Sequence, residues 1–166
     1  MAEKAPTADA IAEVIEALSD AAERLDELAE QPEERWQARP RAGAWSAVEV
    51  LAHLRSSDDI LTPRLLQIAV RENPLLLSLD ERRWQEVTGY AELPAEQLIE
   101  GFRARREELL FALGRLPLSS WRRTGMHEER GELSLFAVAQ LLVEHEQEHL
   151  EQVERALGGR DSSSQQ

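Results

Sequence analysis

Four stretches of the chain repeat apolar residues every three or four positions, the spacing that places them on one side of an α-helix. The first stretch ends near Glu30, and the second begins at Ser46. The third begins at Pro94, and the last runs from Ser134 to Leu157. No strand pattern of appreciable length and no internal repeat is visible. The pattern predicts an all-α protein, a four-helix bundle with longer crossover connections.

Polar residues and prolines mark where these helices begin and end. Ser46 and Glu49 have the spacing of a capping box, in which each side chain accepts a hydrogen bond from the other residue's free amide. Pro63 interrupts the second helix, which therefore either kinks and continues to about Arg71 or stops at Leu61 and restarts. Pro94 suits the first position of the third helix.

The segments between the helices also show patterns that predict structure. Residues 73–93 are too apolar for a free linker, so we expect them to pack over the bundle with one short helix near Asp80–Glu86. Trp36 is expected to close one end of the core. Arg103, Arg105 and Arg106 alternate with acidic residues and are expected to form ion pairs on a solvated face.

Length and composition narrow the class of protein. A chain of 166 residues suggests one domain, at 1–158, followed by a polar, disordered tail at 159–166. No signal peptide or membrane span is visible, so we expect a cytoplasmic protein without a membrane partner. The net charge of −13 disfavours nucleic acid. With no cysteine, any metal must bind histidine or carboxylate.

The histidines are the residues that could bind a metal. His145 and His149 are four apart on the last helix, so both rings lie on one face, about 6 Å apart along the axis. That face looks inward, and a buried imidazole needs a partner. The pair is either two core or surface histidines or two ligands of a divalent metal. A third ligand would favour the metal, and His53 lies on the inward stripe of the second helix.

Two stretches resemble the DinB-like superfamily. The first is the run from Trp36 through Trp45-Ser46 to Leu51-Ala52-His53-Leu54, and the second is Leu141-Leu142-Val143-Glu144-His145-Glu146-Gln147-Glu148-His149-Leu150. The resemblance implies a four-helix bundle of the DinB/YfiT-like type. It also implies a divalent metal (Zn, Ni, Fe or Mn) held by one histidine of helix two and two histidines of helix four. His53, His145 and His149 match these ligands.

The same resemblance implies several activities on a small-molecule substrate. One is a metal-dependent transferase that uses a low-molecular-weight thiol against small electrophiles. Another is a metal-dependent hydrolase, for which Glu49 is the candidate catalytic base. A stress-related homodimer without enzymatic activity is the alternative, with its interface in the apolar segment from Leu75 to Trp84. His127, in the loop before the last helix, is expected to be exposed unless it reaches the mouth of the pocket.

Overall fold

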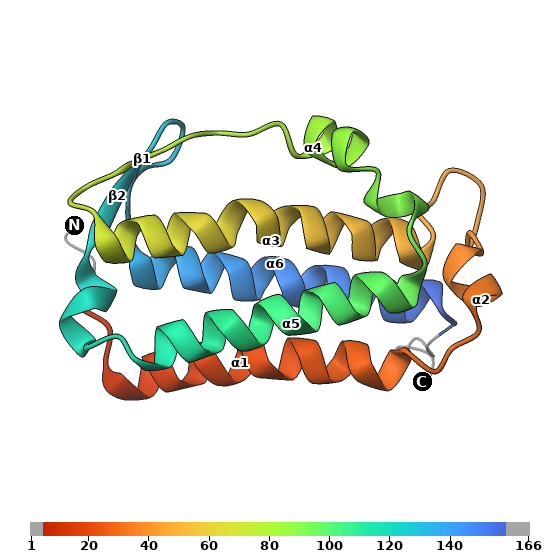
Figure 1. Cartoon of the computed structure of the whole chain (residues 1–166), viewed down its shortest axis with the longest axis horizontal. Helices are drawn as coiled ribbons and strands as arrows, with labels where there is room; N and C mark the ends of the chain where they lie inside the picture. Colours follow the sequence, from red (N-terminus) through yellow and green to blue (C-terminus); the bar gives the residue numbers. More distant parts are fainter. Residues whose placement is uncertain (1–4, 159–166) are drawn as a thin grey trace, which may run out of the picture.

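The computed structural model describes residues 5–158; the tail predicted at 159–166 lies outside these residues, as do residues 1–4. Four long helices lie side by side along the molecule (Figure 1). They are α1 (Ala8–Leu28), α3 (Ala47–Val70), α5 (Ala95–Gly114) and α6 (Leu135–Ala156). This confirms the predicted all-α four-helix bundle. None of the helices within residues 5–158 has the length and apolarity needed to cross a bilayer.

The predicted caps hold the ends of these helices. The Ser46 hydroxyl accepts from the Glu49 amide at 3.4 Å, and the Glu49 carboxylate accepts from the Ser46 amide at 2.8 Å. Pro94 is the N-cap of α5, one residue before the position predicted for it. Gly158 follows α6 with φ of +86°, a left-handed conformation that ends a helix and favours glycine.

The second helix does not stop at its proline. α3 continues without a break through Pro63 to Val70, which decides between the two predicted outcomes. Pro63 is exposed, so the ring points away from the packed core and the backbone carbonyl left without its helical partner can face water. This continuity gives α3 enough length to pack along α6 (Figure 1).

The crossover from α3 to α5, residues 71–94, passes over the bundle and is called the arch below. It contains β1 (Leu75–Leu76), α4 (Glu81–Thr88) and the 3-10 helix η1 (Tyr90–Glu92), and it runs above α3 in Figure 1. This confirms the expected packing and the short helix near Asp80–Glu86. Two further short helices, α2 (Glu33–Gln37) and η2 (Leu118–Arg122), lie in the other connections. Trp36, on α2, is buried as predicted.

A small sheet pins one end of the arch. β1 pairs in parallel with β2 (Thr124–His127), which pairs antiparallel with β3 (Gly131–Ser134). The Met126 amide donates to the Pro74 carbonyl at 2.8 Å, which ties the two connections together. These three strands are only two to four residues long, too short to show an alternating pattern in the sequence.

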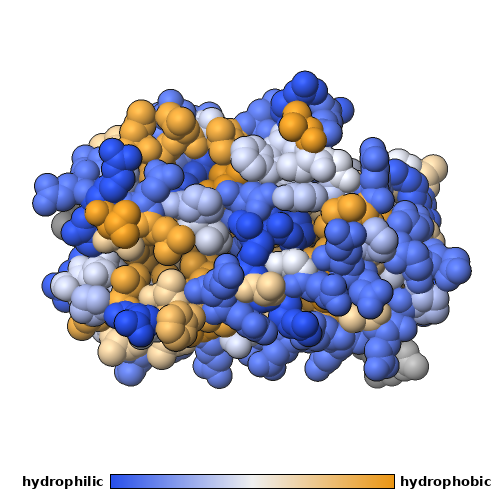
Figure 2. All heavy atoms as spheres, viewed as in Figure 1, coloured by the Kyte–Doolittle hydropathy of each residue, from blue (hydrophilic) through white to orange (hydrophobic). Residues whose placement is uncertain are grey.

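Apolar side chains gather on the face of the molecule at the end that carries this sheet. Figure 2 shows them at the left of the view. Leu66, Val70, Leu75 and Leu77 are among the exposed large hydrophobic residues of this part of the chain. The predicted homodimer interface includes part of this surface, and it stays a prediction.

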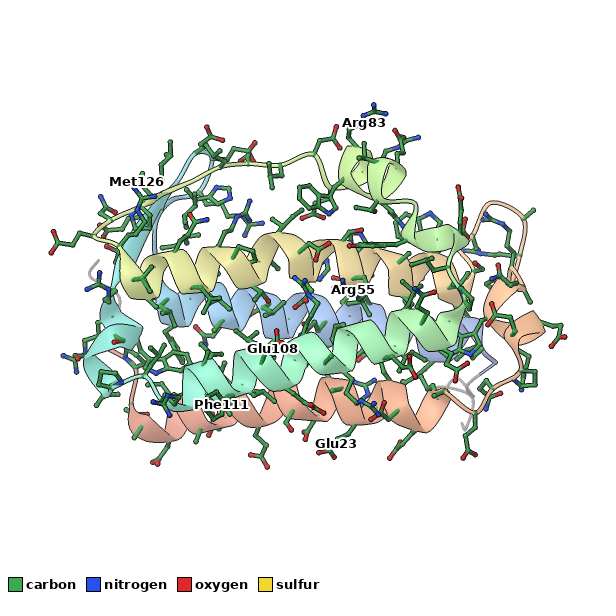
Figure 3. All side chains as sticks on the ribbon, in the orientation of Figure 1. Glu23, Arg55, Arg83, Glu108, Phe111 and Met126 are labelled. Atoms are coloured by element: carbon green, nitrogen blue, oxygen red, sulfur yellow. The ribbon has the colours of Figure 1, made fainter. Side chains whose placement is uncertain are left out.

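The apolar core is divided into two clusters by a polar layer at mid-length. One cluster surrounds Leu25, Trp36, Leu51 and Phe102, and the other surrounds Leu18, Leu65, Leu109 and Trp121. Between them, α3, α5 and α6 bury charged side chains (Arg55, Asp58, Arg106 and Glu146). Figure 3 labels Arg55 at mid-length of the bundle, between α3 and α5. The candidate histidines lie at the edge of this polar layer.

Candidate metal centre

The first half of α3 lies beside the second half of α6, and the three candidate histidines meet there. His53 lies two turns after the capping box of α3. His145 and His149 lie one turn apart on the facing side of α6. All three are half-buried, with ligand atoms that lie within 4.8 Å of one another. The structure therefore brings together the three residues that the sequence singled out.

The three rings lie close to one another. The Nε2 atoms of His53 and His145 are 3.1 Å apart. Ring centroids are separated by 5.0 Å for His53 and His145, 4.6 Å for His53 and His149, and 4.4 Å for His145 and His149. Three imidazoles at such distances can direct their nitrogen lone pairs at one small cation.

Neighbouring side chains orient two of the rings. Nδ1 of His149 lies 3.0 Å from Oε1 of Gln152, a contact that leaves Nε2 of His149 for a ligand role. The Ser57 hydroxyl lies 3.5 Å from Nε2 of His145. Nδ1 of His145 is buried without a hydrogen-bond partner in the described part of the chain. The converging ring nitrogens of the three histidines fit a bound divalent cation.

Two of the histidines, His53 and His145, are neutral at physiological pH. Burial, together with the neighbouring His149, lowers the pKa of His53 to about 4. Burial lowers the pKa of His145 to about 3, and the charges of His149 and His53 contribute to the same shift. Neutral imidazole is the form that binds a metal, so protons do not compete for these two rings near neutrality.

The carboxylates of Glu49 and Glu81 lie near the centre, and they have different surroundings. Glu49, the base candidate from the sequence, accepts from the Ser46 amide and hydroxyl through Oε2 and pairs with Arg39 through Oε1. Glu81, the first residue of α4, has Oε2 4.0 Å from Nε2 of His53 and is 45% exposed in its side chain. Glu81 was missed because no sequence pattern shows which residue of the arch faces α3.

Two cavities flank the histidines, and Glu81 lines both. One, of about 350 Å³, lies under the arch against His145. The other, of about 770 Å³, opens beside His53 and Trp45. A ligand in the first cavity would lie directly against the histidine cluster, because His145 belongs to its wall.

His127 lies in the wall of the first cavity, and the expectation of an exposed loop residue was wrong for it. It is only 6% exposed, because it ends β2 under the arch. Its Nδ1 accepts from the amides of Glu129 at 3.2 Å and Arg130 at 3.3 Å. The sequence did not reveal the burial of His127, because a strand of four residues has no recognisable period.

Behind the histidines lies a buried ion-pair network. Arg106 pairs with both carboxylate oxygens of Glu146 and lies 3.7 Å from Asp58. Asp58 also accepts from Arg105 at 2.7 Å and from Arg55 at 3.3 Å. The expected solvated arginine face was therefore wrong for Arg106, which is 1% exposed. Burial raises the pKa of Glu146, and the Arg106 guanidinium opposes that rise.

The family of the chain follows from a comparison with known families. The model of the DinB superfamily matches residues 13–153, which is most of the chain. The chain belongs to the DinB superfamily. This confirms the resemblance that the sequence carries in its second and last helices.

Relatives and a solved structure give further context for this superfamily member. Two proteins of Oceanobacillus iheyensis named "putative metal-dependent hydrolase" are 29% identical over 66% of the chain and 24% identical over 74% of it. The chain spans 63% of the length of the first and 70% of the second. YfiT from Bacillus subtilis, described as a probable metal-dependent hydrolase with an unusual four-helix bundle topology, matches with a TM-score of 0.81. That match has 17% identity over 96% of this chain and 94% of YfiT, so it shows the shared fold.

Proposed function

We propose that the protein is a metal-dependent hydrolase in which His53, His145 and His149 hold the divalent cation. The convergence of the three imidazoles, whose ligand atoms lie within 4.8 Å of one another, is the observation that carries this proposal. The names of the two relatives point to the same class of enzyme. A cation held by three histidines has an open position, where it acts as a Lewis acid toward a bound water or substrate.

In this proposal Glu81 is the general base. Its carboxylate is 4.0 Å from Nε2 of His53, lines both cavities and is accessible to water. It can accept the proton of the attacking water and later deliver it to the leaving group. Glu49 is the base that the sequence predicts, but both of its oxygens are engaged by Ser46 and Arg39. We therefore assign Glu49 to holding the start of α3, and with it His53.

The arch has a second role in this mechanism. α4 begins at Glu81 and packs over α3 (Figure 1), so the segment that supplies the base lies over the helix that carries His53. Trp84 and Tyr90 fasten the arch, since both donate to Oδ2 of Asp59 on α3, at 3.4 Å and 2.7 Å. The base is thereby held beside the histidines by contacts that do not depend on a substrate.

The decisive experiment measures metal content and ester hydrolysis in the same protein preparations, produced without a histidine tag. The parent chain is expected to bind one divalent ion and to hydrolyse nitrophenyl esters. His145→Ala should lose the metal, whereas Glu81→Gln should keep the metal and lose at least about a hundredfold in turnover, the range of a general base. Glu108→Gln, an exposed carboxylate on α5 outside both cavities, is the matched control and should behave as the parent. A metal-loaded Glu81→Gln variant with parental turnover would rule out the assigned base.

A thiol transferase is the second candidate, because a cavity of about 350 Å³ against His145 is large enough for a small thiol. The two candidates differ in what a thiol does. After substitution with cobalt, a thiol ligand should change the visible absorption spectrum if the protein is a transferase. Hydrolysis of esters without any thiol supports the hydrolase.

A further inference from the structure

The cavity under the arch has two chemically different ends. Toward the histidines, its wall carries His145 with Glu144 and Glu148 of α6. Away from them it carries His127 and the guanidinium-bearing Arg64 and Arg130. Glu81 lies between the two ends, 4.0 Å from Nε2 of His53 and close enough to Arg64 to act on its charge. Leucine and valine side chains line the length between these ends: Leu61, Leu76, Leu133, Val138 and Leu141.

The positive end contains a hydrogen-bond donor on a residue that is only 6% exposed. Nδ1 of His127 accepts from two backbone amides, so in the neutral ring the proton is on Nε2. Burial and the charges of Arg64 and Arg130 lower the pKa of His127, which keeps the ring neutral. The Nε2–H has no partner among the described residues, and the side chain is more than nine-tenths buried in the cavity wall.

The two arginines keep their charge available. Arg64 donates to the Leu77 carbonyl at 2.6 Å, which anchors the side chain to the arch without neutralising it. Within residues 5–158, no carboxylate forms an ion pair with either Arg64 or Arg130. The charges of Glu81 and Glu129 act on Arg64 without forming an ion pair with it. Two guanidiniums without an ion-pair partner in the described chain, together with the N–H of His127, therefore line one wall and can attract an anion.

The rise of α3 gives the distance that a ligand must span to reach both ends of the cavity. Arg64 follows Ser57 by seven residues on α3, which is about 10 Å of helix rise. Ser57 touches His145, so the positive end lies about two helical turns from the histidine cluster. The apolar side chains of Leu61 and Leu141 lie in the wall of the cavity over this interval.

We propose that Arg64, Arg130 and the Nε2–H of His127 form an anion subsite for an elongated, amphiphilic substrate. A carboxylate or phosphate group binds at this subsite, the apolar body lies along Leu61 and Leu141, and the reacting group reaches His145. This proposal rests on the proposed function for the identity of the reacting end, but the anion subsite itself does not need the metal.

Ligand binding to the full chain, freed of metal with a chelator, tests the subsite. Nuclear magnetic resonance titration would compare phenylbutyrate, phenylbutyl phosphate and the neutral phenylbutanol. At least one anion should bind about tenfold or more tightly than the alcohol, since hydrogen bonds to charged groups have that strength. The tighter of the two anions identifies the head group as carboxylate or phosphate.

Variants of Arg130 provide the decisive comparison, because its exposed side chain can change without disturbing the core. Arg130→Gln should weaken anion binding about tenfold and leave alcohol binding unchanged. Arg130→Lys should keep part of the preference, and Arg122→Gln, an exposed arginine outside the cavity wall, should keep all of it.

Two results would overturn the subsite. The first is equal affinity for the anions and the alcohol. The second is anion binding that requires added metal and is unchanged in Arg130→Gln, which would mean that the anion binds to the metal. Arg130-dependent binding in a chain that takes up no metal would support the subsite while removing the proposed hydrolase. Metal-dependent hydrolysis, combined with anion binding that Arg130→Gln does not change, would support the hydrolase and remove the subsite.

Discussion

Breaking the buried pair between Arg106 and Glu146 should destabilise the bundle strongly. The two side chains are 1% and 3% exposed, so Arg106→Met leaves the Glu146 carboxylate beside Asp58 without its guanidinium. Removing one partner of a buried pair costs about 3–5 kcal/mol. A domain of this kind has about 5–15 kcal/mol of unfolding free energy in total, so the loss is a large fraction of it.

Urea unfolding followed by tryptophan fluorescence measures this cost, because Trp36 and Trp121 are buried in opposite core clusters. With a denaturant slope of about 2 kcal/mol/M, the midpoint of Arg106→Met should fall by about 1.5–2.5 M. Arg103→Met is the matched control on the same helix. Its side chain is 51% exposed and 4.0 Å from Asp26, so the change in unfolding free energy should be below about 1 kcal/mol.

The double variant Arg106→Met with Glu146→Leu separates a charge effect from a packing effect. It should recover much of the loss, because it leaves no unpaired charge and Asp58 keeps its partners Arg105 and Arg55. A cost below about 1 kcal/mol for Arg106→Met would refute the reasoning. So would a double variant whose cost equals the sum of the two single costs, since independent sites add in that way.

Three further predictions concern other parts of the molecule. Chelation of the metal should lower the melting temperature of the parent chain but not that of His145→Ala, because a ligand that binds only the folded state stabilises it; calorimetry with and without chelator measures both. Burial, followed by the hydrogen bond to Asp59, raises the pKa of Tyr90, so its phenolate absorbance should appear at higher pH in the folded chain than in urea. The stability that this protonated hydroxyl contributes should be complete below the ordinary pKa of 10.0 and be lost as the pH rises through the raised value; Tyr90→Phe removes both signals. Ser46→Ala should cost about 1 kcal/mol of unfolding free energy in urea, since it removes the capping hydrogen bond to the Glu49 amide.

The sequence predicted the parts of the fold that depend on local pattern. The apolar stripes located the four helices, and the spacing of Ser46 and Glu49 located the capping box at the start of α3. The pairing of His145 with His149 follows from helix geometry, because residues four apart share a face. His53 needed the resemblance to a family, since no local rule places one helix beside another.

What the sequence missed depends on contacts between distant segments. Arg106 looks like any surface arginine until Glu146 is placed opposite it across the bundle. Glu81 becomes a candidate base only when the arch lies over α3. His127 is buried because β2 pairs with strands on both sides, and those strands are too short to be recognised by alternation.

The polar layer at mid-length also fixes how the helices align along the bundle. Sliding α5 by one turn would move Arg106 away from Glu146 and into leucine side chains, leaving charges buried without partners. A bundle with a uniform apolar core has no such penalty and can tolerate several alignments. The layer therefore selects a single alignment of α3, α5 and α6, and this is the alignment in which His53 faces His145 and His149.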